Sequence, residues 1–162
     1  MGEPSSSSVT RATAEATLTR TFGDDRHFRA GQWEAIDAAL RGQDSCVFLA
    51  TGAGKSLCYQ LPPLLVPGTF VLVVSPLLAL MEEQVAALRS LGVAAASISS
   101  ARSASENRST RELLQAKPPG LTHLYVSPEL AVHSKLLPLL ARLAQTKALC
   151  CVAVDEALCI SQ

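Results

Sequence analysis

One short stretch constrains the fold of this chain more than any other: residues 49–56, which read Leu-Ala-Thr-Gly-Ala-Gly-Lys-Ser. Gly52 and Gly54 have no Cβ, so the backbone N–H groups around them can turn inward around an anion. An apolar run at 46–49 predicts a strand before the loop, and the breaker-free run from Ser56 predicts a helix after it. A loop of this kind between a strand and a helix is typical of nucleotide phosphate binding. The alternative is a glycine-rich turn that binds nothing.

The loop contains the groups that a nucleoside triphosphate and its metal ion require. Lys55 would reach the β- and γ-phosphates, and the Ser56 hydroxyl would ligate Mg²⁺. Leu49 departs from the strict G-x-x-x-x-G-K-S/T pattern, because it stands at the first glycine position. The expected phosphate-binding positions are Thr51, Gly52, Ala53, Gly54, Lys55 and Ser56.

Apolar runs alternate with helical patterns along the chain. Continuous apolar runs predict strands at 69–74, 93–98, 121–126 and 149–154. Helical spacing predicts helices at 9–22, 28–42, 77–91 and 130–143, the last interrupted by Pro138. Residues 99–111 are expected to be a polar loop that leads into a short helix through Leu113 and Leu114. The alternation predicts an α/β fold with a parallel sheet, in which ligands gather at the carboxyl ends of the strands.

The composition limits the classes of protein and partner. Fourteen basic and fourteen acidic residues balance, so any nucleic-acid contact must be local. No run approaches the length of a membrane span and no signal-peptide pattern begins the chain, which predicts a soluble intracellular protein without membrane contact. The five cysteines lack C-x-x-C spacing, so no zinc site is expected. Residues 1–8 are Ser-rich and are expected to form a disordered tail.

An acidic pair and a glutamine complete the candidate site. Asp155 and Glu156 follow the last apolar run, where Asp155 would hold Mg²⁺ through water and Glu156 would orient or deprotonate the water that attacks the γ-phosphate. The alternative for this pair is a solvated helix start. Gln32 offers a donor and an acceptor side by side, which matches the edge of adenine, although a solvated residue at the start of a helix would look the same.

Several motifs in this order closely resemble the first motor domain of RecQ-type DNA helicases. The resemblance covers about residues 18–162. It rests on Phe22-Gly23 followed by Phe28-Arg29-x-Gly31-Gln32, on Thr51 to Pro62 (TGAGKSLCYQLP), on Val73 to Met81 (VVSPLLALM), on Tyr125 to Glu129 (YVSPE), and on Val154-Asp155-Glu156-Ala157 with Cys159 to Gln162 (CISQ).

The resemblance implies a role for each matching residue. Arg29 and Gln32 would recognise the adenine of ATP, and Lys55, Asp155 and Glu156 would form the catalytic group, with Ser56 and Asp155 at Mg²⁺. Two segments would contact the backbone of single-stranded or forked DNA: Ser75-Pro76-Leu77, through amides at a helix start, and Ser127-Pro128-Glu129. The alternative for each Ser-Pro is an ordinary strand-end turn. Phe22 and Phe28 are expected to pack around the adenine site rather than to stack on the base.

The resemblance also implies a domain organisation. Residues 9–162 would be a partial RecA-like P-loop NTPase domain, ending just after Asp-Glu-Ala-Leu, with the second motor domain absent. Leu158 stands where the family has histidine, and leucine can neither donate nor accept a hydrogen bond, so coupling between hydrolysis and DNA is in doubt. The isolated chain is expected to bind ATP and single-stranded DNA weakly without unwinding. The family implies the nucleus, or the cytoplasm of a bacterium; the oligomeric state stays open.

Two other functions remain open from the sequence. One is a non-catalytic truncated product that binds nucleotide or nucleic acid without turnover, which Leu158 and the early stop would fit. The other is a fragment of an RNA helicase of the same superfamily, which shares the phosphate loop and the adenine glutamine. Against the second, residues 75–80 (SPLLAL) differ from the Pro-Thr-Arg-Glu-Leu type of stretch that RNA helicases carry there.

Overall fold

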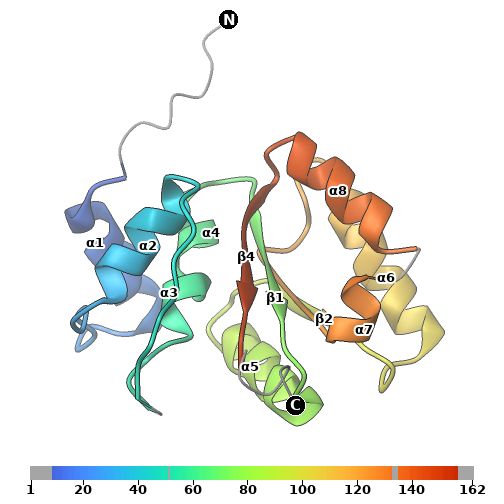
Figure 1. Cartoon of the computed structure of the whole chain (residues 1–162), viewed down its shortest axis with the longest axis horizontal. Helices are drawn as coiled ribbons and strands as arrows, with labels where there is room; N and C mark the ends of the chain where they lie inside the picture. Colours follow the sequence, from blue (N-terminus) through green and yellow to red (C-terminus); the bar gives the residue numbers. More distant parts are fainter. Residues whose placement is uncertain (1–8, 51, 133–134, 157–162) are drawn as a thin grey trace, which may run out of the picture.

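The computed structural model describes residues 9–50, 52–132 and 135–156. At its centre lies a parallel four-stranded sheet with the strand order β2-β3-β1-β4 (Figure 1). The strands are β1 (Phe70–Val74), β2 (Ala95–Ile98), β3 (His123–Val126) and β4 (Leu149–Val154). The four predicted strands at 69–74, 93–98, 121–126 and 149–154 are therefore confirmed, as is the α/β class of the fold.

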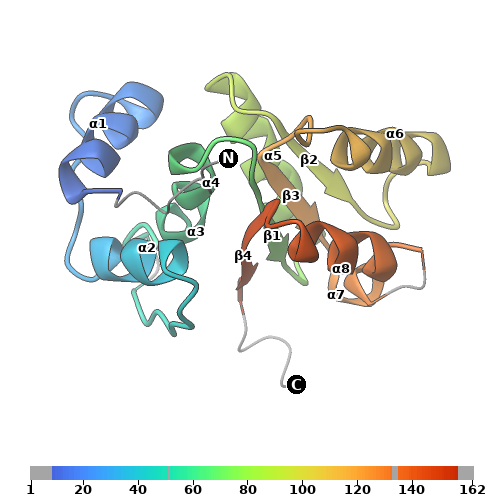
Figure 2. The same cartoon turned by 90° about the horizontal axis from the view of Figure 1, so that it is seen from above.

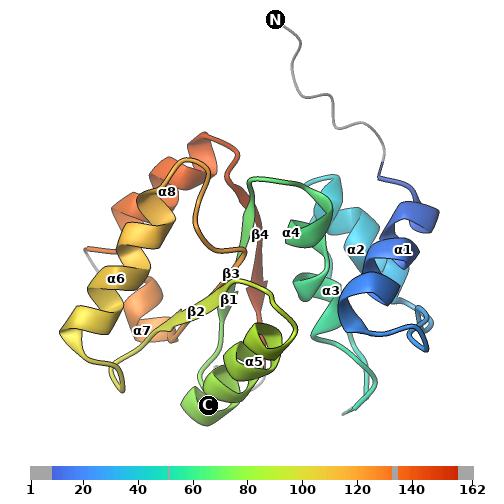
Figure 3. The same ribbon diagram turned by 180° about the vertical axis from the view of Figure 1, so that it is seen from behind.

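Helices cover both faces of this sheet (Figures 1 and 2). One face carries α3 (Leu57–Gln60), α4 (Pro62–Leu65) and α5 (Leu78–Ser90), with α1 (Arg11–Phe22) and α2 (Gln32–Leu40) packed outside them. The other face carries α6 (Ala104–Gln115), α7 (Pro128–Ala131) and α8 (Leu137–Gln145). Seen from behind, α6 and α8 lie on one side of the strands and α1 to α4 on the other (Figure 3).

The central strand β1 explains why two helical layers form. Successive side chains of a strand point to opposite faces, and β1 is apolar on both. Val71 and Val73 are fully buried against α3 and α5, whereas Phe70 and Leu72 pack toward α6 and α8. A strand that is apolar at every position is stable only when both of its faces are covered.

The register of the strands brings their carboxyl ends to one edge. Val73 pairs with Tyr125 of β3 on one side and with Ala153 of β4 on the other. The residues that directly follow these strands, Ser75 and Asp155, therefore emerge at the same edge of the sheet. This is the edge at which ligands bind in parallel α/β folds.

The strand predicted at 46–49 is wrong. Residues 43–50 carry no helix or strand, and the Phe48 side chain is 84% exposed. A strand needs a neighbour for its backbone groups, and within the described part of the chain none pairs with this segment. Strand β4 forms the edge of the described sheet on that side, with Val152 and Val154 about half exposed.

Three local predictions also differ from the structure. The 99–111 segment is not a loop throughout, because α6 begins at Ala104, where Ser103 and Glu106 form a reciprocal capping box. Pro138 does not interrupt a helix but lies in the first turn of α8, where a missing N–H costs nothing. The helix after the phosphate loop is only one turn long, and a second turn starts at Pro62.

The membrane prediction can be compared with the helices that the structure describes. Within residues 9–50, 52–132 and 135–156, no helix combines the length and the apolar character needed to cross a bilayer.

Candidate functional site

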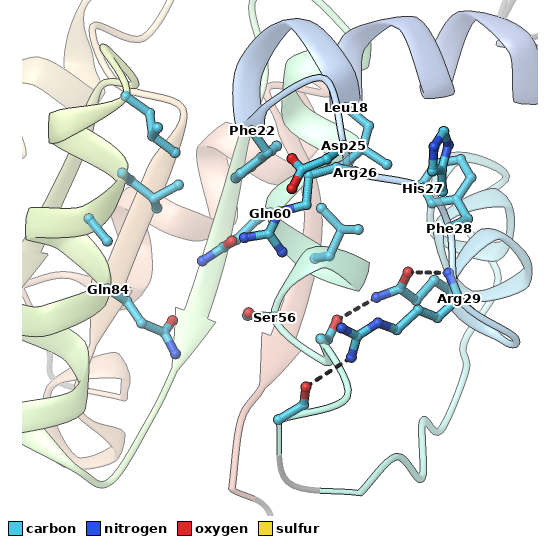
Figure 4. Close-up of a pocket in the computed structure, with 17 residues that line it drawn as sticks. Leu18, Phe22, Asp25, Arg26, His27, Phe28, Arg29, Ser56, Gln60 and Gln84 are labelled. Carbon is cyan, nitrogen blue, oxygen red and sulfur yellow. Dashed lines mark hydrogen bonds between the residues drawn. The ribbon is translucent and has the colours of Figure 1, made fainter.

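A cavity of about 600 Å³ lies between the start of α2, the glycine loop and α5 (Figure 4). Its walls include the segment from Asp25 to Arg29, the loop residues Gly52 and Gly54, and Gln84 of α5. Figure 4 shows Phe22, Gln60 and Gln84 on one side of the cavity and Arg29 on the other. A concave site of this size, with convergent polar groups, suits a small-molecule ligand such as a nucleotide.

The two residues predicted to recognise adenine are bonded to the glycine loop. Gln32, which is 2% exposed, accepts a hydrogen bond from the backbone N–H of Arg29 at 2.7 Å. Its amide nitrogen donates to the carbonyl oxygen of Gly54 at 2.9 Å, and the Arg29 guanidinium donates to the carbonyl oxygen of Gly52 at 2.9 Å (Figure 4). These contacts fasten the phosphate loop to the start of α2.

Gly54 is required at its position by this contact. Its φ is +83°, and a Cβ added there would lie 2.5 Å from the amide nitrogen of Gln32. A Cβ at Gly52, which has a similar φ of +79°, would meet nothing within 4 Å. The loop therefore has one glycine that is needed for conformation and for space, and another that is needed for conformation alone.

Lys55 and Glu156 face each other across the site. The Lys55 Nζ lies 3.9 Å from a carboxylate oxygen of Glu156, and the two side chains are 36% and 34% exposed. The backbone of Glu156 is in the left-handed region, with φ of 54°, which a residue with a side chain rarely adopts. Strained backbone of this kind is concentrated at functional sites, where it directs a side chain toward its task.

Asp155 is held at the end of β4 by several contacts. Its backbone N–H donates to the carbonyl oxygen of Val74 at 2.9 Å, which extends the ladder between β4 and β1. Its Oδ1 accepts from the backbone N–H of Glu156 at 3.0 Å, and its Oδ2 accepts from the hydroxyl of Tyr59 at 2.9 Å. The Tyr59 contact was not foreseen from the sequence, because these two residues are 96 positions apart.

Tyr59 is itself buried between two elements of the site. Its hydroxyl also lies 3.0 Å from Oε1 of Gln84, so it bridges the end of β4 and α5. Burial raises the pKa of the Tyr59 phenol well above its ordinary value, and the neighbouring Tyr125 and the Asp155 carboxylate raise it further. The phenol therefore keeps its proton at physiological pH and acts as a hydrogen-bond donor.

The two Ser-Pro segments lie at the ends of adjacent strands. Ser75 follows β1 and Ser127 follows β3, and both serines are almost fully buried. The Ser75 hydroxyl accepts from the backbone N–H of Leu77, just before α5, at 3.4 Å. The Ser127 hydroxyl is buried without a hydrogen-bond partner in the described part of the chain. Of the other residues in the two segments, Leu77 and Glu129 are exposed, and Pro76 and Pro128 are half-buried.

Phe22 and Phe28 pack against the buried clusters beside the cavity. Phe22 packs against two of the buried clusters, and Phe28 packs against the cluster of α1 and α2. The rings of Phe28 and Trp33 are tilted, with centroids 5.8 Å apart. Both phenylalanines also line the cavity.

Some of the predicted site cannot be compared with the structure. Thr51 and Leu158 lie outside the described residues. The remaining predicted nucleotide and catalytic residues converge on the glycine loop and the end of β4: Arg29, Gln32, Gly52, Ala53, Gly54, Lys55, Ser56, Asp155 and Glu156. Among the described residues, no group of three or more His, Cys, Asp or Glu side chains forms a cluster suited to a metal ion.

Comparison with known families bears on this geometry. The sequence profile of the DEAD/DEAH box helicases matches residues 29–162, which include all the predicted nucleotide, catalytic and DNA-contacting residues. The chain belongs to the DEAD/DEAH box helicase family.

Curated relatives of this DEAD/DEAH box chain include RecQ helicases. It is 40% identical over 154 residues to the ATP-dependent DNA helicase RecQ of Haemophilus influenzae, covering 95% of this chain and 24% of that protein. It is also 40% identical over 148 residues to the ATP-dependent DNA helicase Q5 of Rattus norvegicus, covering 91% of this chain and 15% of that protein. The resemblance to RecQ-type helicases is confirmed. The chain spans a quarter or less of the length of these relatives.

A solved helicase structure shares the fold. The DUF1998 helicase MrfA bound to DNA and AMPPNP superposes with a TM-score of 0.63 at 19% sequence identity, covering 96% of this chain and 22% of that chain. The form of MrfA bound to DNA alone gives a TM-score of 0.59 at 21% identity, covering 85% of this chain and 19% of that chain. The four-stranded parallel sheet and its helices thus correspond to part of a RecA-like helicase fold, as the sequence predicted.

Proposed function

We propose that this chain is the ATP-binding part of the first motor domain of a RecQ-like ATP-dependent DNA helicase. The helicase would move 3′ to 5′ along DNA and act in repair and recombination. The observation that carries the proposal is the set of contacts that joins Arg29 and Gln32 to the glycine loop, with Lys55 lying 3.9 Å from Glu156 beside it. These groups suit an adenine nucleotide with its phosphates on the loop.

In this proposal Gln32 bonds the phosphate loop in the nucleotide-free protein and contacts the base when adenine binds. Both ends of its amide are bonded within the protein, to Arg29 and to Gly54. Reading the edge of adenine would therefore require one of these hydrogen bonds to be exchanged for a bond to the base. Such an exchange would couple the presence of adenine to the position of the phosphate loop.

The residues present also fit Mg²⁺. Hydroxyl and carboxylate oxygens are ligands that this ion prefers, and the Ser56 hydroxyl and the Asp155 carboxylate are the oxygens available at the loop and at the end of β4. When bound, the ion would neutralise charge on the phosphates. Ser56 and Asp155 would hold it, Lys55 would contact the β- and γ-phosphates, and Glu156 would orient or deprotonate the attacking water.

The DNA strand would run over the ends of the neighbouring strands. Ser75-Pro76-Leu77 would offer amides at the start of α5, and Ser127-Pro128-Glu129 would continue the contact beside β3. Single-stranded or forked DNA is the proposed substrate. The proposed location is the nucleus in a eukaryote or the cytoplasm in a bacterium, and the relatives compared above come from a bacterium and from a eukaryote.

By themselves, these 162 residues would bind ATP and single-stranded DNA weakly and unwind nothing. A translocating motor closes two domains on the nucleotide, and the second domain supplies an arginine to the transition state. The loss of such an arginine costs about three to five orders of magnitude in rate. Leu158, in place of the family's histidine, would further weaken the coupling of hydrolysis to DNA.

The test is DNA-stimulated ATP hydrolysis by this chain beside a longer chain that continues through a second motor domain, each with Leu158 and with Leu158→His. We expect turnover from the longer chain with histidine and none from the 162-residue chain. DNA-stimulated hydrolysis by the short chain alone would overturn the two-domain account. In parallel, deoxyribo- and ribo-oligonucleotides are compared as ligands, and a clear preference for RNA would favour an RNA helicase instead.

A further inference from the structure

The hydroxyl of Tyr59 connects two groups that have separate places in the candidate site. It lies 2.9 Å from Oδ2 of Asp155, at the end of β4, and 3.0 Å from Oε1 of Gln84, on α5. Gln84 lines the cavity, whereas Tyr59 is only 9% exposed and does not line it. Tyr59 thus lies behind the site and touches Asp155 from the protein side.

The hydrogen bonds of these three groups can be assigned. A phenol has one proton, so it donates to one acceptor at a time. Because the two ends of a glutamine amide are nearly isosteric, Gln84 satisfies all three groups when its N–H₂ donates to the phenol oxygen and the phenol donates to Asp155. The other carboxylate oxygen of Asp155 accepts from the backbone N–H of Glu156 at 3.0 Å. Both carboxylate oxygens are therefore held in place.

We propose that Tyr59 is a positioning residue for Asp155, whose hydroxyl fixes the orientation of the carboxylate toward the phosphate loop, and that Gln84 orients this hydroxyl from the wall of the cavity. The inference rests on the proposed role of Asp155 at Mg²⁺. A carboxylate that is free to rotate would have to be ordered when the ion binds, and this ordering would weaken binding. Tyr59 therefore contributes to the part of nucleotide affinity that depends on Mg²⁺ and not to the rest.

The experiment measures binding of a fluorescent ATP analogue to the full chain, with Mg²⁺ and with EDTA, for the wild type and for Tyr59→Phe. The variant keeps the ring and removes only the hydroxyl. We expect its affinity to fall about tenfold in Mg²⁺, as for loss of a hydrogen bond to a charged group, and to stay within about twofold in EDTA. Thr146→Val is the control, because it also removes one hydroxyl, which bonds the carbonyl oxygen of Leu143 at the end of α8 and contacts neither Tyr59 nor Asp155. It should leave the Mg²⁺ dependence unchanged.

A second arm asks whether Tyr59 acts through Asp155. In the Asp155→Asn background the added effect of Tyr59→Phe should vanish, because coupled residues are not additive. Equal losses in Mg²⁺ and in EDTA, or full additivity with Asp155→Asn, would overturn the inference. If Tyr59→Phe fails to fold, as judged by circular dichroism, Gln84→Leu takes its place, and its loss of affinity must be about threefold greater in Mg²⁺ than in EDTA. Failure of the wild type to bind the analogue would instead refute the proposed function.

Discussion

The amide nitrogen of Gln32 donates a hydrogen bond of 2.9 Å to the carbonyl oxygen of Gly54, and so joins the start of α2 to the phosphate loop. The two residues are 22 positions apart in sequence. The contact is possible only because residue 54 has no side chain, since a Cβ would lie 2.5 Å from that nitrogen. A residue expected to read the base therefore also determines where the phosphates can bind.

Gly54→Ala should damage the loop more than Gly52→Ala does. Both positions have positive φ, which costs an alanine about 1–2 kcal/mol, but only the alanine at 54 would also displace Gln32. Losing the two hydrogen bonds of Gln32 adds about 1 kcal/mol each. Urea unfolding of the two variants measures the difference. Equal losses of stability would show that the contact between Gln32 and Gly54 does not contribute to the free energy of unfolding.

Gln32→Glu should loosen the loop without removing the side chain. The glutamate keeps an acceptor for the Arg29 N–H but directs a second oxygen at the Gly54 carbonyl, where a donor is needed. We expect the affinity for an ATP analogue to fall about tenfold, as for an unsatisfied buried group. Titration of the analogue measures this, with Glu34→Gln on the exposed side of α2 as the control. An affinity equal to that of the wild type would show that the Gln32 amide does not hold the loop in its nucleotide-binding conformation.

His123 should make the stability depend on pH. The ring is fully buried, with Nε2 2.8 Å from the carbonyl oxygen of Gln60, and burial lowers its pKa to about 4. The unfolded chain binds a proton near pH 6.5 and the folded chain does not, so stability is complete above that pH and falls as the pH drops toward 4. Between pH 7 and pH 5 the loss from this group is about 2 kcal/mol.

Urea unfolding of the wild type and of His123→Asn at the two pH values isolates this contribution. The exposed His27 serves as the control position, in the variant His27→Asn. The wild type and His27→Asn should lose stability toward pH 5 by similar amounts, whereas His123→Asn should lose about 2 kcal/mol less. An unchanged pH dependence in His123→Asn would mean that the ring is protonated in the folded state.

Much of the sheet could be predicted because burial on both faces leaves a strong pattern. Phe70 to Val74 is a continuous apolar run, and such runs indicate central parallel strands. The run at 46–49 has the same character and forms no strand, because strand formation also depends on a neighbour that local sequence does not specify. Helix α6 begins earlier than the polar composition of 99–111 suggests, because Ser103 and Glu106 form the S-x-x-E capping box that starts it.

The nucleotide site was predictable in part. The glycine loop, Lys55 and the acidic pair follow from motif chemistry, and the structure brings Lys55 and Glu156 to 3.9 Å. The Tyr59 contact with Asp155 depends on how α3 packs against the end of β4, and no spacing along the chain predicts it. Likewise, Gln32 can be proposed as a base-reading residue from its amide, but its bond to Gly54 is a property of the folded loop.

The most direct measurement is the equilibrium affinity of this chain for a fluorescent ATP analogue in Mg²⁺, with and without Lys55→Ala. Lys55 is the lysine of the glycine loop, so its loss should weaken triphosphate binding by about ten- to a hundredfold. Lys117→Ala, at an exposed lysine after α6, should bind within about twofold of the wild type. Binding that is unaffected by Lys55→Ala would contradict the assignment of this loop to nucleotide phosphates, and with it the central claim of the account.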